Sequence, residues 1–257
     1  MDFLQFNKIK SSLRKFFLPD LQGVSRSRIL ELKNTYRGER AFIIGNGPSL
    51  KNMDLAHLKN EYTFGLNRIY LMFDELGFKT NFLVSVNQLL LKQCAEEINR
   101  LKIPKFISSF ASDYISLDRN TVFIKSLGDP QFSTDLTRGI WEGATVTYVA
   151  MQVAYYLGFS EVILIGVDHN FKTKGTPHKI VEQRKDDPNH FSPKYFKGMK
   201  WQLPDLPTSE LAYRLSRYQF ESDGRKIVDA TVGGKLKVFP KVKYEELFKV
   251  HNQISTQ

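Results

Sequence analysis

The sequence contains a single cysteine, Cys94, among its 257 residues, so it can form no disulfide within the chain and suits a reducing compartment. It has no uninterrupted apolar run that approaches the roughly 18 residues of a transmembrane helix. The first residues lack the basic stretch and apolar block of a secretory signal peptide. No recognisable nucleic-acid-binding motif accompanies the basic residues. From these absences we expect a cytoplasmic protein that has no nucleic-acid partner.

The composition is that of a globular protein with an excess of positive charge. Hydrophobic residues make up 42% of the chain, which is ordinary for a chain that buries a sizeable core. The formal net charge is +10 at pH 7. Such an excess favours anionic partners such as nucleotides, phosphorylated sugars, nucleic acid or an anionic membrane surface, and it does not choose among them.

The first forty residues carry nine basic and four acidic side chains, about half of the net charge. Apolar residues recur at helical spacing from Phe6 to Phe17 with basic residues between them, which predicts a basic amphipathic helix that ends near Pro19. Such a helix can pack on its own domain, or it can lie on a membrane surface. Residues 1–18 are therefore our candidate for a peripheral contact at the inner face of the membrane. A second helix is predicted from residue 26 to 36.

The most informative stretch is an apolar run, residues 40–44, that ends in a glycine turn. We interpret it as a buried strand, a tight turn and the start of a helix. Backbone N–H groups and the positive end of a helix dipole at such a turn suit a phosphate or diphosphate. The candidate ligands are Gly45, Asn46, Gly47 and Ser49.

The rest of the chain alternates between strand and helix patterns, which predicts an α/β fold with a Rossmann-like parallel sheet covered by helices on both faces. The strands are expected at 62–67, 82–87, 105–109, 121–124 and 161–168, and the helices at 55–60, 69–76, 89–101, 143–157 and 209–223. In the last of these helices we expect Leu211, Leu215, Tyr218 and Phe220 to face the core.

Four predicted strands end in a polar residue that can bind a ligand: Asn46, Asn67, Asn87 and Asp168. Ligands of parallel sheets bind at the carboxyl ends of the strands. Asparagine offers both a donor and an acceptor, which suits a base, a ribose or sugar hydroxyls. Asparagine is also a common turn residue, so the structural interpretation stays open.

Three motifs together resemble the DUF115 group, whose members are described as similar to the archaeal 6-hydroxymethylpterin diphosphokinase, the MptE-like proteins. They are Gly-Asn-Gly-Pro-Ser-Leu at 45–50, Gly-Leu-Asn-Arg-Ile-Tyr at 65–70 and the stretch 157–168 that ends in Gly-Val-Asp. They are also similar to the bacterial sialyltransferases of glycosyltransferase family 42 and to the central domain of the motility-associated flagellin glycosylation factors. The resemblance covers residues 40–168 well, is looser from 169 to 239, and does not decide between the two chemistries.

The sialyltransferase resemblance implies a GT-A-variant, Rossmann-type domain that binds a CMP-activated sugar without a metal cofactor. It implies that Asn46 and Asn67 contact the nucleotide and its phosphate and that Asn87 contacts the donor. A Thr or Ser at the start of the long helix binds the nucleotide in that family, and Thr145, with Thr147 beside it, is the nearest match.

The same resemblance implies a lid, residues 169–208, whose histidine is the general base and whose tyrosines assist the phosphate leaving group. His190 and Tyr195 are the counterparts, although their spacing departs from the family's. A histidine near neutral pKa suits the deprotonation of an acceptor hydroxyl. His169 and His178 lie in the same segment, but their spacing matches no metal-ligand pattern.

Two other functions stay open. A 6-hydroxymethylpterin diphosphokinase would need ATP and Mg²⁺, and Asp168 would then hold the metal. A nucleotide-sugar binding module would need no catalysis.

Residues 229–236 imitate a phosphate loop without its full pattern. We expect a hairpin or loop there, between 227–228 and 238–239, that could still line the site.

The favoured function is that of a transferase, a glycosyltransferase that uses a nucleotide-activated sugar, with a CMP-linked acidic sugar as donor, in surface glycan or glycoprotein assembly. Its acceptor would be a glycan or glycolipid, and the chain could form a homo-oligomer. The expected organisation is an N-terminal basic extension (1–39), a Rossmann-like nucleotide-binding core (40–168), a lid (169–208) and a C-terminal helix and hairpin that complete the same domain (209–257).

Overall fold

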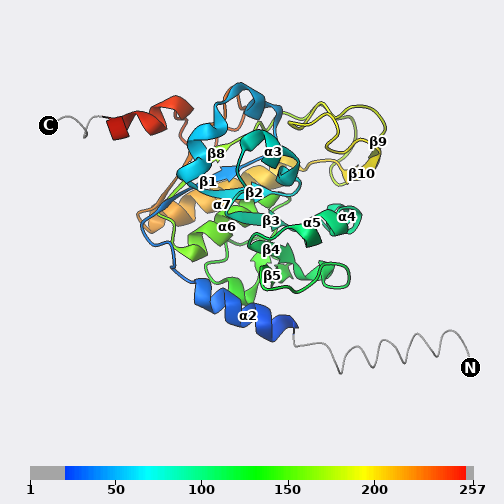
Figure 1. The fold of residues 1–257 in the computed structure, drawn as a ribbon, viewed down its shortest axis with the longest axis horizontal. Helices are drawn as coiled ribbons and strands as arrows, with labels where there is room; N and C mark the ends of the chain where they lie inside the picture. Colours follow the sequence, from blue (N-terminus) through cyan, green and yellow to red (C-terminus); the bar gives the residue numbers. More distant parts are fainter. Residues whose placement is uncertain (1–20, 253–257) are drawn as a thin grey trace, which may run out of the picture.

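The computed structural model describes residues 21–252, and the helix predicted from 6 to 17 lies outside the described residues. The fold is mixed α/β and Rossmann-like, as predicted, with a central sheet of seven parallel strands (Figure 1). The strand order is β11-β8-β1-β2-β3-β4-β5. The strands are β1 (Arg40–Ile44), β2 (Tyr62–Leu66), β3 (Phe82–Ser85), β4 (Lys105–Ser108), β5 (Thr121–Ile124), β8 (Glu161–Ile165) and β11 (Lys226–Asp229).

This strand order places a topological switch point between β1 and β8. From β1 the chain adds strands in one direction as far as β5, and it then returns to place β8 on the other side of β1. The loops that follow β1 and β8 therefore leave the sheet in opposite directions. In doubly wound sheets the crevice between two such loops is the usual place of a ligand.

Helices cover both faces of the sheet (Figure 1). Alternation along β1 sends Ala41 and Ile43 into one apolar core and Phe42 and Ile44 into the other. The first core is closed by α2 (Leu21–Leu32), α6 (Val146–Leu157) and α7 (Leu206–Ser222). The second is closed by α3 (Phe73–Leu76), α4 (Gln88–Gln93), α5 (Ala95–Arg100) and short 3₁₀ helices, which include η1 (Pro48–Asn52), η2 (Leu55–Asn60) and η3 (Ile69–Met72).

Helix α6 is the central helix of the first layer. Thr145 caps its N-terminus, and Gly158, in the left-handed conformation with φ of 98°, ends it. Every residue from Thr147 to Leu157 is buried, because the sheet lies on one side of the helix and α7 on the other. This burial fixes the position of the N-terminus of α6 relative to the strand ends.

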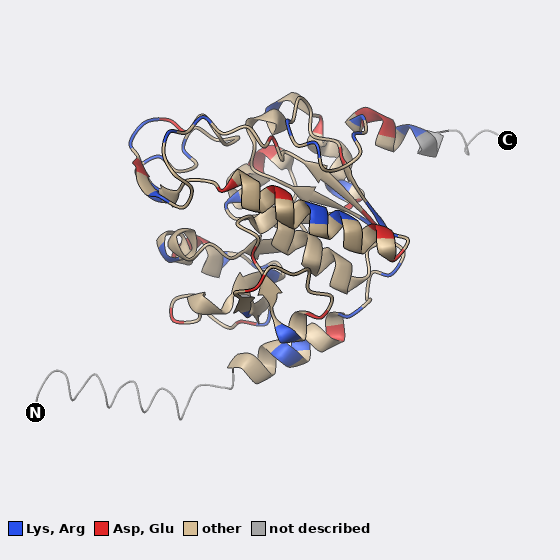
Figure 2. Ribbon diagram, turned by 180° about the vertical axis from the view of Figure 1, so that it is seen from behind, with Lys and Arg blue, Asp and Glu red and all other residues tan. Residues whose placement is uncertain are grey.

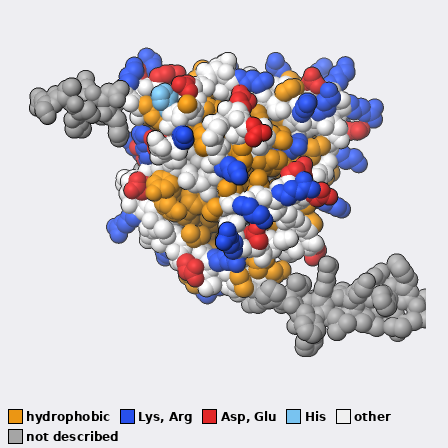
Figure 3. Space-filling view, viewed as in Figure 1, with side chains coloured by type: hydrophobic (Ala, Val, Ile, Leu, Met, Phe, Trp, Pro, Cys, Tyr) orange, Lys and Arg blue, Asp and Glu red, His pale blue; other side chains and the backbone are white. Residues whose placement is uncertain are grey.

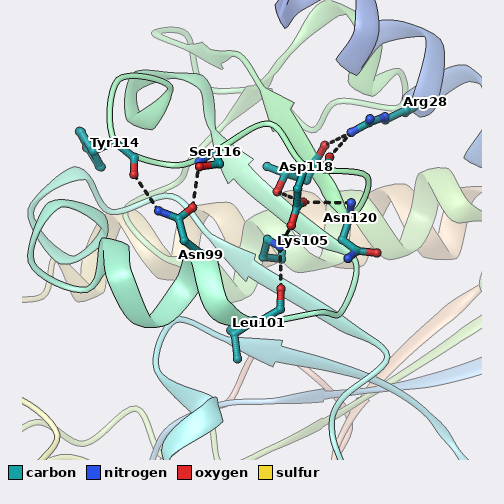
Figure 4. A network of polar contacts seen from close by, with 9 residues as sticks. Arg28, Asn99, Leu101, Lys105, Tyr114, Ser116, Asp118 and Asn120 are labelled. Atoms are coloured by element: carbon teal, nitrogen blue, oxygen red, sulfur yellow. Dashed lines mark hydrogen bonds and ion pairs between the residues drawn. The ribbon is translucent and has the colours of Figure 1, made fainter.

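A polar network around the Lys105–Asp118 ion pair fixes α2 to the far edge of the sheet (Figure 4). The Lys105 side chain on β4 is 1% exposed, and its Nζ lies 3.3 Å from Asp118 Oδ2 and 3.0 Å from the Leu101 carbonyl. Burial lowers the pKa of Lys105, and Asp118 opposes that shift. Arg28 on α2 donates to the carbonyls of Asp118 and Thr121. The network thereby connects helix, loop and strand.

Several boundaries differ from those predicted. The helix expected at 26–36 is α2, which ends at Leu32, and Asn34 follows it in the left-handed region with φ of 58°. The stripe expected to face the core in α7 is wrong in part, since Leu211 and Tyr218 are exposed. The buried face instead consists of Ser209, Ala212, Tyr213, Ser216 and Phe220.

The C-terminal and lid segments also differ from expectation. Of the hairpin or loop expected between 227–228 and 238–239, the structure contains the loop, because β11 pairs in parallel with β8 and no antiparallel partner follows it among the described residues. The lid holds an antiparallel pair that was not predicted, β9 (Ile180–Gln183) and β10 (Met199–Gln202). A short parallel pair, β6 (Ser126–Leu127) and β7 (Ile140–Trp141), follows β5, and η4 (Ser109–Ala111), η5 (Leu136–Arg138) and η6 (Tyr244–Asn252) complete the elements.

In the ribbon of Figure 2, segments that hold Lys or Arg alternate with segments that hold Asp or Glu along the helices and loops. Among residues 21–252, no helix has the length and apolar character needed to cross a membrane.

Candidate functional site

A pocket lies at the switch point, at the carboxyl ends of the central strands. It has a volume of about 150 Å³, and we call it the inner pocket. Its walls are the turn after β1, the end of β2, the loop after β8 and the N-termini of α6 and α7. The sequence-predicted residues that line it are Gly45, Asn46, Gly47, Asn67, Thr145, Asp168 and His190.

The inner pocket opens into a larger cleft of about 1160 Å³, the outer cleft. The two hollows share Asn67, Thr145 and His190 as lining residues. The outer cleft extends between α4, the β6–β7 pair and the β9–β10 hairpin. The outer cleft is somewhat larger than the roughly 300–1,000 Å³ of ordinary small-molecule sites, and His190 lines both hollows where they meet.

The glycines of the turn after β1 are required by the neighbouring strand end. A Cβ on Gly45 would lie 2.2 Å from the carbonyl oxygen of Gly166, and one on Gly47 would lie 1.7 Å from Asp168 Oδ2. The N–H groups of both glycines donate into the same region, to the carbonyls of Ile165 and Gly166 at 2.8 and 2.9 Å. These two N–H groups therefore join the turn to β8, and the expectation that they face a phosphate is not met.

The N-terminus of η1 is occupied by a carboxylate of the protein itself. Asp168 accepts hydrogen bonds from the Ser49 hydroxyl at 2.7 Å and from the Ser49 N–H at 3.2 Å. Burial raises the pKa of Asp168, the bonds from Ser49 oppose the rise, and nearby Asp229 adds to it. Ser49 lines neither hollow, so its predicted contact with a phosphate is corrected to a contact with Asp168.

The helix N-terminus that does open into the inner pocket belongs to α6. Thr145 Oγ1 accepts the Thr147 N–H at 3.3 Å and lies 3.2 Å from the hydroxyl of Tyr213. Thr145, Thr147 and Tyr213 all line the pocket. Sequence reasoning missed Tyr213, although Leu206, Ser209 and Tyr213 recur on one face of α7 at spacings of three and four.

Asn46 and Asn67 both reach the inner pocket. Asn46 Nδ2 donates to the Leu66 carbonyl at 3.1 Å, which leaves the buried Oδ1 without a partner among the described residues. Asn67 accepts the Ser85 hydroxyl at 3.0 Å, and its backbone is left-handed with φ of 50°. An acceptor left unpaired beside a pocket is a group that a ligand donor could satisfy after a small rearrangement.

Asn87 serves in part as a structural residue. Its Oδ1 caps α4 by accepting the Leu90 N–H at 2.9 Å, and its Nδ2 donates to Gln202 on β10 at 3.0 Å. It lines the outer cleft and not the inner pocket. The structure thus separates Asn87 from the two other strand-end asparagines.

Unfavourable backbone conformations gather around the two hollows. Five non-glycine residues among those described have positive φ, and four of them line a hollow. Asn67, Ala144 and His169 lie in the inner pocket and His178 in the outer cleft. Such conformations cost free energy and cluster at functional sites in other proteins, where the surrounding structure enforces them.

His190 forms a buried pair with Asp187. The His190 Nδ1 lies 2.8 Å from Asp187 Oδ2, and the Asp187 side chain is 1% exposed. An ionised carboxylate can only accept, so Nδ1 donates to Asp187, and in the neutral imidazole Nε2 then keeps its lone pair. The Nε2 atom has no partner among residues 21–252. Asp187 was missed from the sequence, although a carboxylate three residues before a candidate base could have been noticed.

Tyr195 lies beneath the His190 ring and away from the hollows. The two rings stack with centroids 4.1 Å apart and planes 3° from parallel. The Tyr195 hydroxyl accepts the Arg68 N–H at 3.2 Å, and burial raises the pKa of this phenol. Tyr195 lines neither hollow, so its predicted contact with the leaving group is corrected to support of His190.

The other two lid histidines also pair with carboxylates. His169 Nε2 lies 3.1 Å from Glu210, and His178 Nε2 lies 3.0 Å from Asp205. Within the part of the chain that the structure describes, no three His, Cys, Asp or Glu side chains are grouped so that they could hold a metal ion. Of the residues from 21 to 252, no Lys or Arg lines the inner pocket.

The segment at 229–236 does not line either hollow. The N–H of Lys235 donates to the Asp168 carbonyl at 2.8 Å, and the Lys235 side chain is exposed. The Asp229 side chain is fully buried and pairs with Lys241 at 2.5 Å. The loop therefore supports the residues behind the pocket.

Comparison with protein families gives a match to the 6-hydroxymethylpterin diphosphokinase MptE-like model over residues 15–174, more than half of the chain. The chain belongs to the MptE-like family. Among solved structures, the MAf glycosyltransferase from Magnetospirillum magneticum AMB-1 is similar, with a TM-score of 0.50 and 17% sequence identity. The match covers 88% of this chain but only 39% of that protein, and at this identity it shows a shared fold. No curated protein matches the sequence.

The part of this MptE-like chain that matches the family model contains most of the inner pocket. Residues 15–174 include the turn after β1, Asn67, the N-terminus of α6 and Asp168. They stop before His190, Asp187 and α7. The family match therefore covers one wall of the site, and the lid must be interpreted from its own geometry.

Proposed function

We propose that this MptE-like chain is a glycosyltransferase that uses a nucleotide-activated sugar, with a CMP-linked acidic sugar as the donor. The observation that carries the proposal is the position of the His190–Asp187 pair at the junction of the inner pocket and the outer cleft. The inner pocket would hold the nucleotide phosphate, and the outer cleft would hold the sugar and a glycan or glycolipid acceptor. The resemblance to family 42 sialyltransferases and the fold shared with a glycosyltransferase support it.

The N-terminus of α6 is the proposed phosphate site. Its twelve residues align their peptide dipoles, and the positive end opens into the inner pocket beside Thr145 and Thr147. Among the described residues, no Lys or Arg lines this pocket, and Asp168 contributes a carboxylate. Such a lining suits the single negative charge of a phosphodiester better than the charges of a triphosphate, which enzymes neutralise with Lys, Arg and Mg²⁺.

His190 is the proposed general base. In the tautomer set by Asp187, Nε2 can take the proton of an acceptor hydroxyl as the oxygen attacks the anomeric carbon of the donor. The bond from that carbon to the phosphate oxygen breaks, and CMP leaves with the electron pair. Asp187 stabilises the imidazolium that forms, and Tyr195 holds the ring by stacking. Donors at the α6 N-terminus stabilise the leaving phosphate.

A second candidate is diphosphate transfer from ATP to a 6-hydroxymethylpterin, which the description of the family model favours. This reaction would require Mg²⁺ beside the phosphates. The natural ligand, Asp168, has both carboxylate oxygens engaged with Ser49. The arrangement of described residues does not fit a metal site, and we assign no step to a metal. A nucleotide-sugar binding module without turnover is the third possibility.

A thermal-shift panel with CMP, CDP, UDP, GDP, ATP and a pterin, each with Mg²⁺ and with a chelator, separates these functions. We expect CMP to stabilise the protein in the presence of the chelator. At a concentration one hundred times its Kd, a ligand adds about 2.7 kcal/mol, which raises the Tm of a chain of this size by about 5–10 °C. Stabilisation by ATP with Mg²⁺ alone would contradict the proposal.

A further inference from the structure

A half-buried carboxyl group, Glu142, stands in the wall of the outer cleft on the side of the β6–β7 pair. No sequence motif pointed to it. Its backbone is held in place by the residues around it: the Gln152 side chain on α6, which is fully buried, donates to the Trp141 carbonyl at 2.9 Å. The Glu142 carbonyl in turn accepts the Thr145 N–H at 3.1 Å. Glu142 is thus held in a fixed position immediately before the N-terminus of α6.

The carboxyl has one hydrogen-bond partner among the described residues. Ser126 Oγ donates to Glu142 Oε1 in a short hydrogen bond, and Ser126 Oγ lies 3.4 Å from the buried Ser108 Oγ. No Lys, Arg or His of residues 21–252 forms an ion pair with Glu142. The Oε2 atom has no partner among residues 21–252, and it is not among the fully buried unpartnered atoms, so solvent reaches it in the wall of the cleft.

Aromatic side chains line the same outer cleft. Trp141, adjacent to Glu142, is half-buried and packs edge-on against Tyr148. Phe110 is 56% exposed and Tyr114 is half-buried. Figure 3 shows apolar side chains exposed between charged ones on the face seen in Figure 1. Aromatic groups in the same cleft as a carboxylate without an ion-pair partner are typical of a surface that binds a ligand with apolar and hydroxyl-bearing faces.

We propose that Glu142, Ser126 and Trp141 form the subsite for a saccharide acceptor, in which the Glu142 carboxylate accepts hydrogen bonds from sugar hydroxyls and the indole contacts the ring. The proposal rests on the proposed glycosyl transfer, because it names the class of the second substrate. His190 lines the same cleft, so a sugar held at Glu142 has a path to the base. A neutral sugar offers the hydroxyl donors that an unpaired carboxylate requires.

The binding of four neutral sugars tests this subsite without requiring turnover. Methyl glycosides of galactose, glucose, N-acetylglucosamine and N-acetylgalactosamine are titrated into the full chain and followed by ligand-observed NMR. At least one should bind, and Glu142→Gln should weaken it about tenfold, the effect of losing a hydrogen bond to a charged group. The matched control is Glu161→Gln. Glu161 is also half-buried but lies at the opposite end of the sheet, where it pairs with Lys226 at 3.0 Å, and its substitution should leave the affinity unchanged.

The pH dependence of sugar binding distinguishes contact from a structural role. Burial raises the pKa of Glu142 and the Ser126 hydrogen bond lowers it, so Ser126→Ala should raise it further. Binding should weaken as the pH falls through this pKa, and in Ser126→Ala the loss should begin at higher pH. Other titratable groups line the cleft and serve as the common background in both proteins: Lys92, Tyr114, His178, His190, Lys200 and Asp205.

Two results would overturn the subsite: none of the four sugars binds the wild-type chain, or Glu142→Gln binds them as well as Glu161→Gln does. Failure of the proposed function has a different signature, in which the sugars bind through Glu142 while CMP fails to stabilise the protein. Unfolding temperatures of all variants accompany the titrations. A loss of binding in Glu142→Gln supports the subsite when the Tm of this variant equals that of the Glu161→Gln control.

Discussion

Replacing Gly47 with alanine should destabilise the protein through a clash with Asp168. The new Cβ would lie 1.7 Å from Asp168 Oδ2, 2.5 Å from its Cγ and 2.8 Å from the Gly166 carbonyl oxygen. Asp168 cannot turn aside without losing its two hydrogen bonds from Ser49. Overpacking costs about 1–3 kcal/mol and a strained or lost hydrogen bond adds about 1–3 kcal/mol, so we expect a loss of about 3 kcal/mol. Urea unfolding measures it.

A double-mutant cycle shows whether Asp168 is the cause. Asp168→Ala alone should cost about 2 kcal/mol, because it leaves the Ser49 N–H and hydroxyl unpaired. In the double variant the carboxylate is absent, so the loss should be smaller than the sum of the single losses by about 1–2 kcal/mol. The residual cost reflects the Gly166 carbonyl, which remains close.

The matched control for this cycle is Gly128→Ala. A Cβ at Gly128 meets nothing within 4 Å. This substitution should be neutral or stabilise the protein by up to about 1 kcal/mol, because it restricts the unfolded chain. Additive losses in the cycle, or a Gly47→Ala variant as stable as Gly128→Ala, would refute the reasoning that the turn glycines serve the contact with the end of β8.

Three further predictions concern the base, the helix terminus and the edge network. His190→Ala should lower kcat for sugar transfer by about 10²–10⁴-fold with little change in donor KM, and Asp187→Asn should act in the same direction; full turnover in either would remove the base assignment. Thr145→Val should weaken CMP binding measured by calorimetry. The substitution also removes the N-cap of α6, which costs about 1 kcal/mol of stability, so the Tm of the variant is measured as a control. Burial alone would raise the pKa of Asp118, but hydrogen bonds from Thr121, Asn120 and Lys105 lower it overall. The stabilisation that results is present above the ordinary aspartate pKa of 3.8 and is lost as the pH falls through the lower pKa of the folded state. Asp118→Asn should therefore reduce the fall of the unfolding free energy at acid pH, and an unchanged fall would contradict the shift.

The sheet could be predicted because its strands are short apolar runs separated by clear helix patterns. Most of the strand-end residues that line the pocket could be predicted from this sheet, because the carboxyl ends of parallel strands share one edge. Gly45, Asn46, Asn67 and Asp168 accordingly all lie at the inner pocket. What the sequence did not reveal is how these residues divide their hydrogen bonds between a ligand and the protein.

The partners of Ser49 illustrate that limit. Serine after a glycine turn suits a phosphate, and nothing local shows that a carboxylate 119 positions later takes its hydroxyl. Tyr195 is similar, because only the folded lid shows that Arg68 holds its hydroxyl inward. The β9–β10 hairpin was missed because each strand has only four residues, two of them apolar, and a long segment separates the two strands.

The sequence predicted that the helix after the glycine turn would face a ligand, whereas in the structure the N-terminus of α6 opens into the pocket. The glycine turn precedes a five-residue 3₁₀ helix, whose first turn Asp168 occupies. The twelve-residue α6 begins in the pocket after Gly143 and Ala144, both with positive φ. Residue patterns predicted the helix and Thr145, but the direction of its N-terminus depends on packing against α7 and the sheet.

The most direct test of sugar transfer is a single ³¹P NMR time course. The protein is incubated with a CMP-linked sialic acid, lactose, ATP, Mg²⁺ and 6-hydroxymethylpterin in one tube. Our account predicts that the phosphodiester signal of the donor is converted into the phosphomonoester of CMP while the ATP signals persist, and that His190→Ala slows this conversion. Conversion of ATP to AMP with an unchanged donor signal would contradict it.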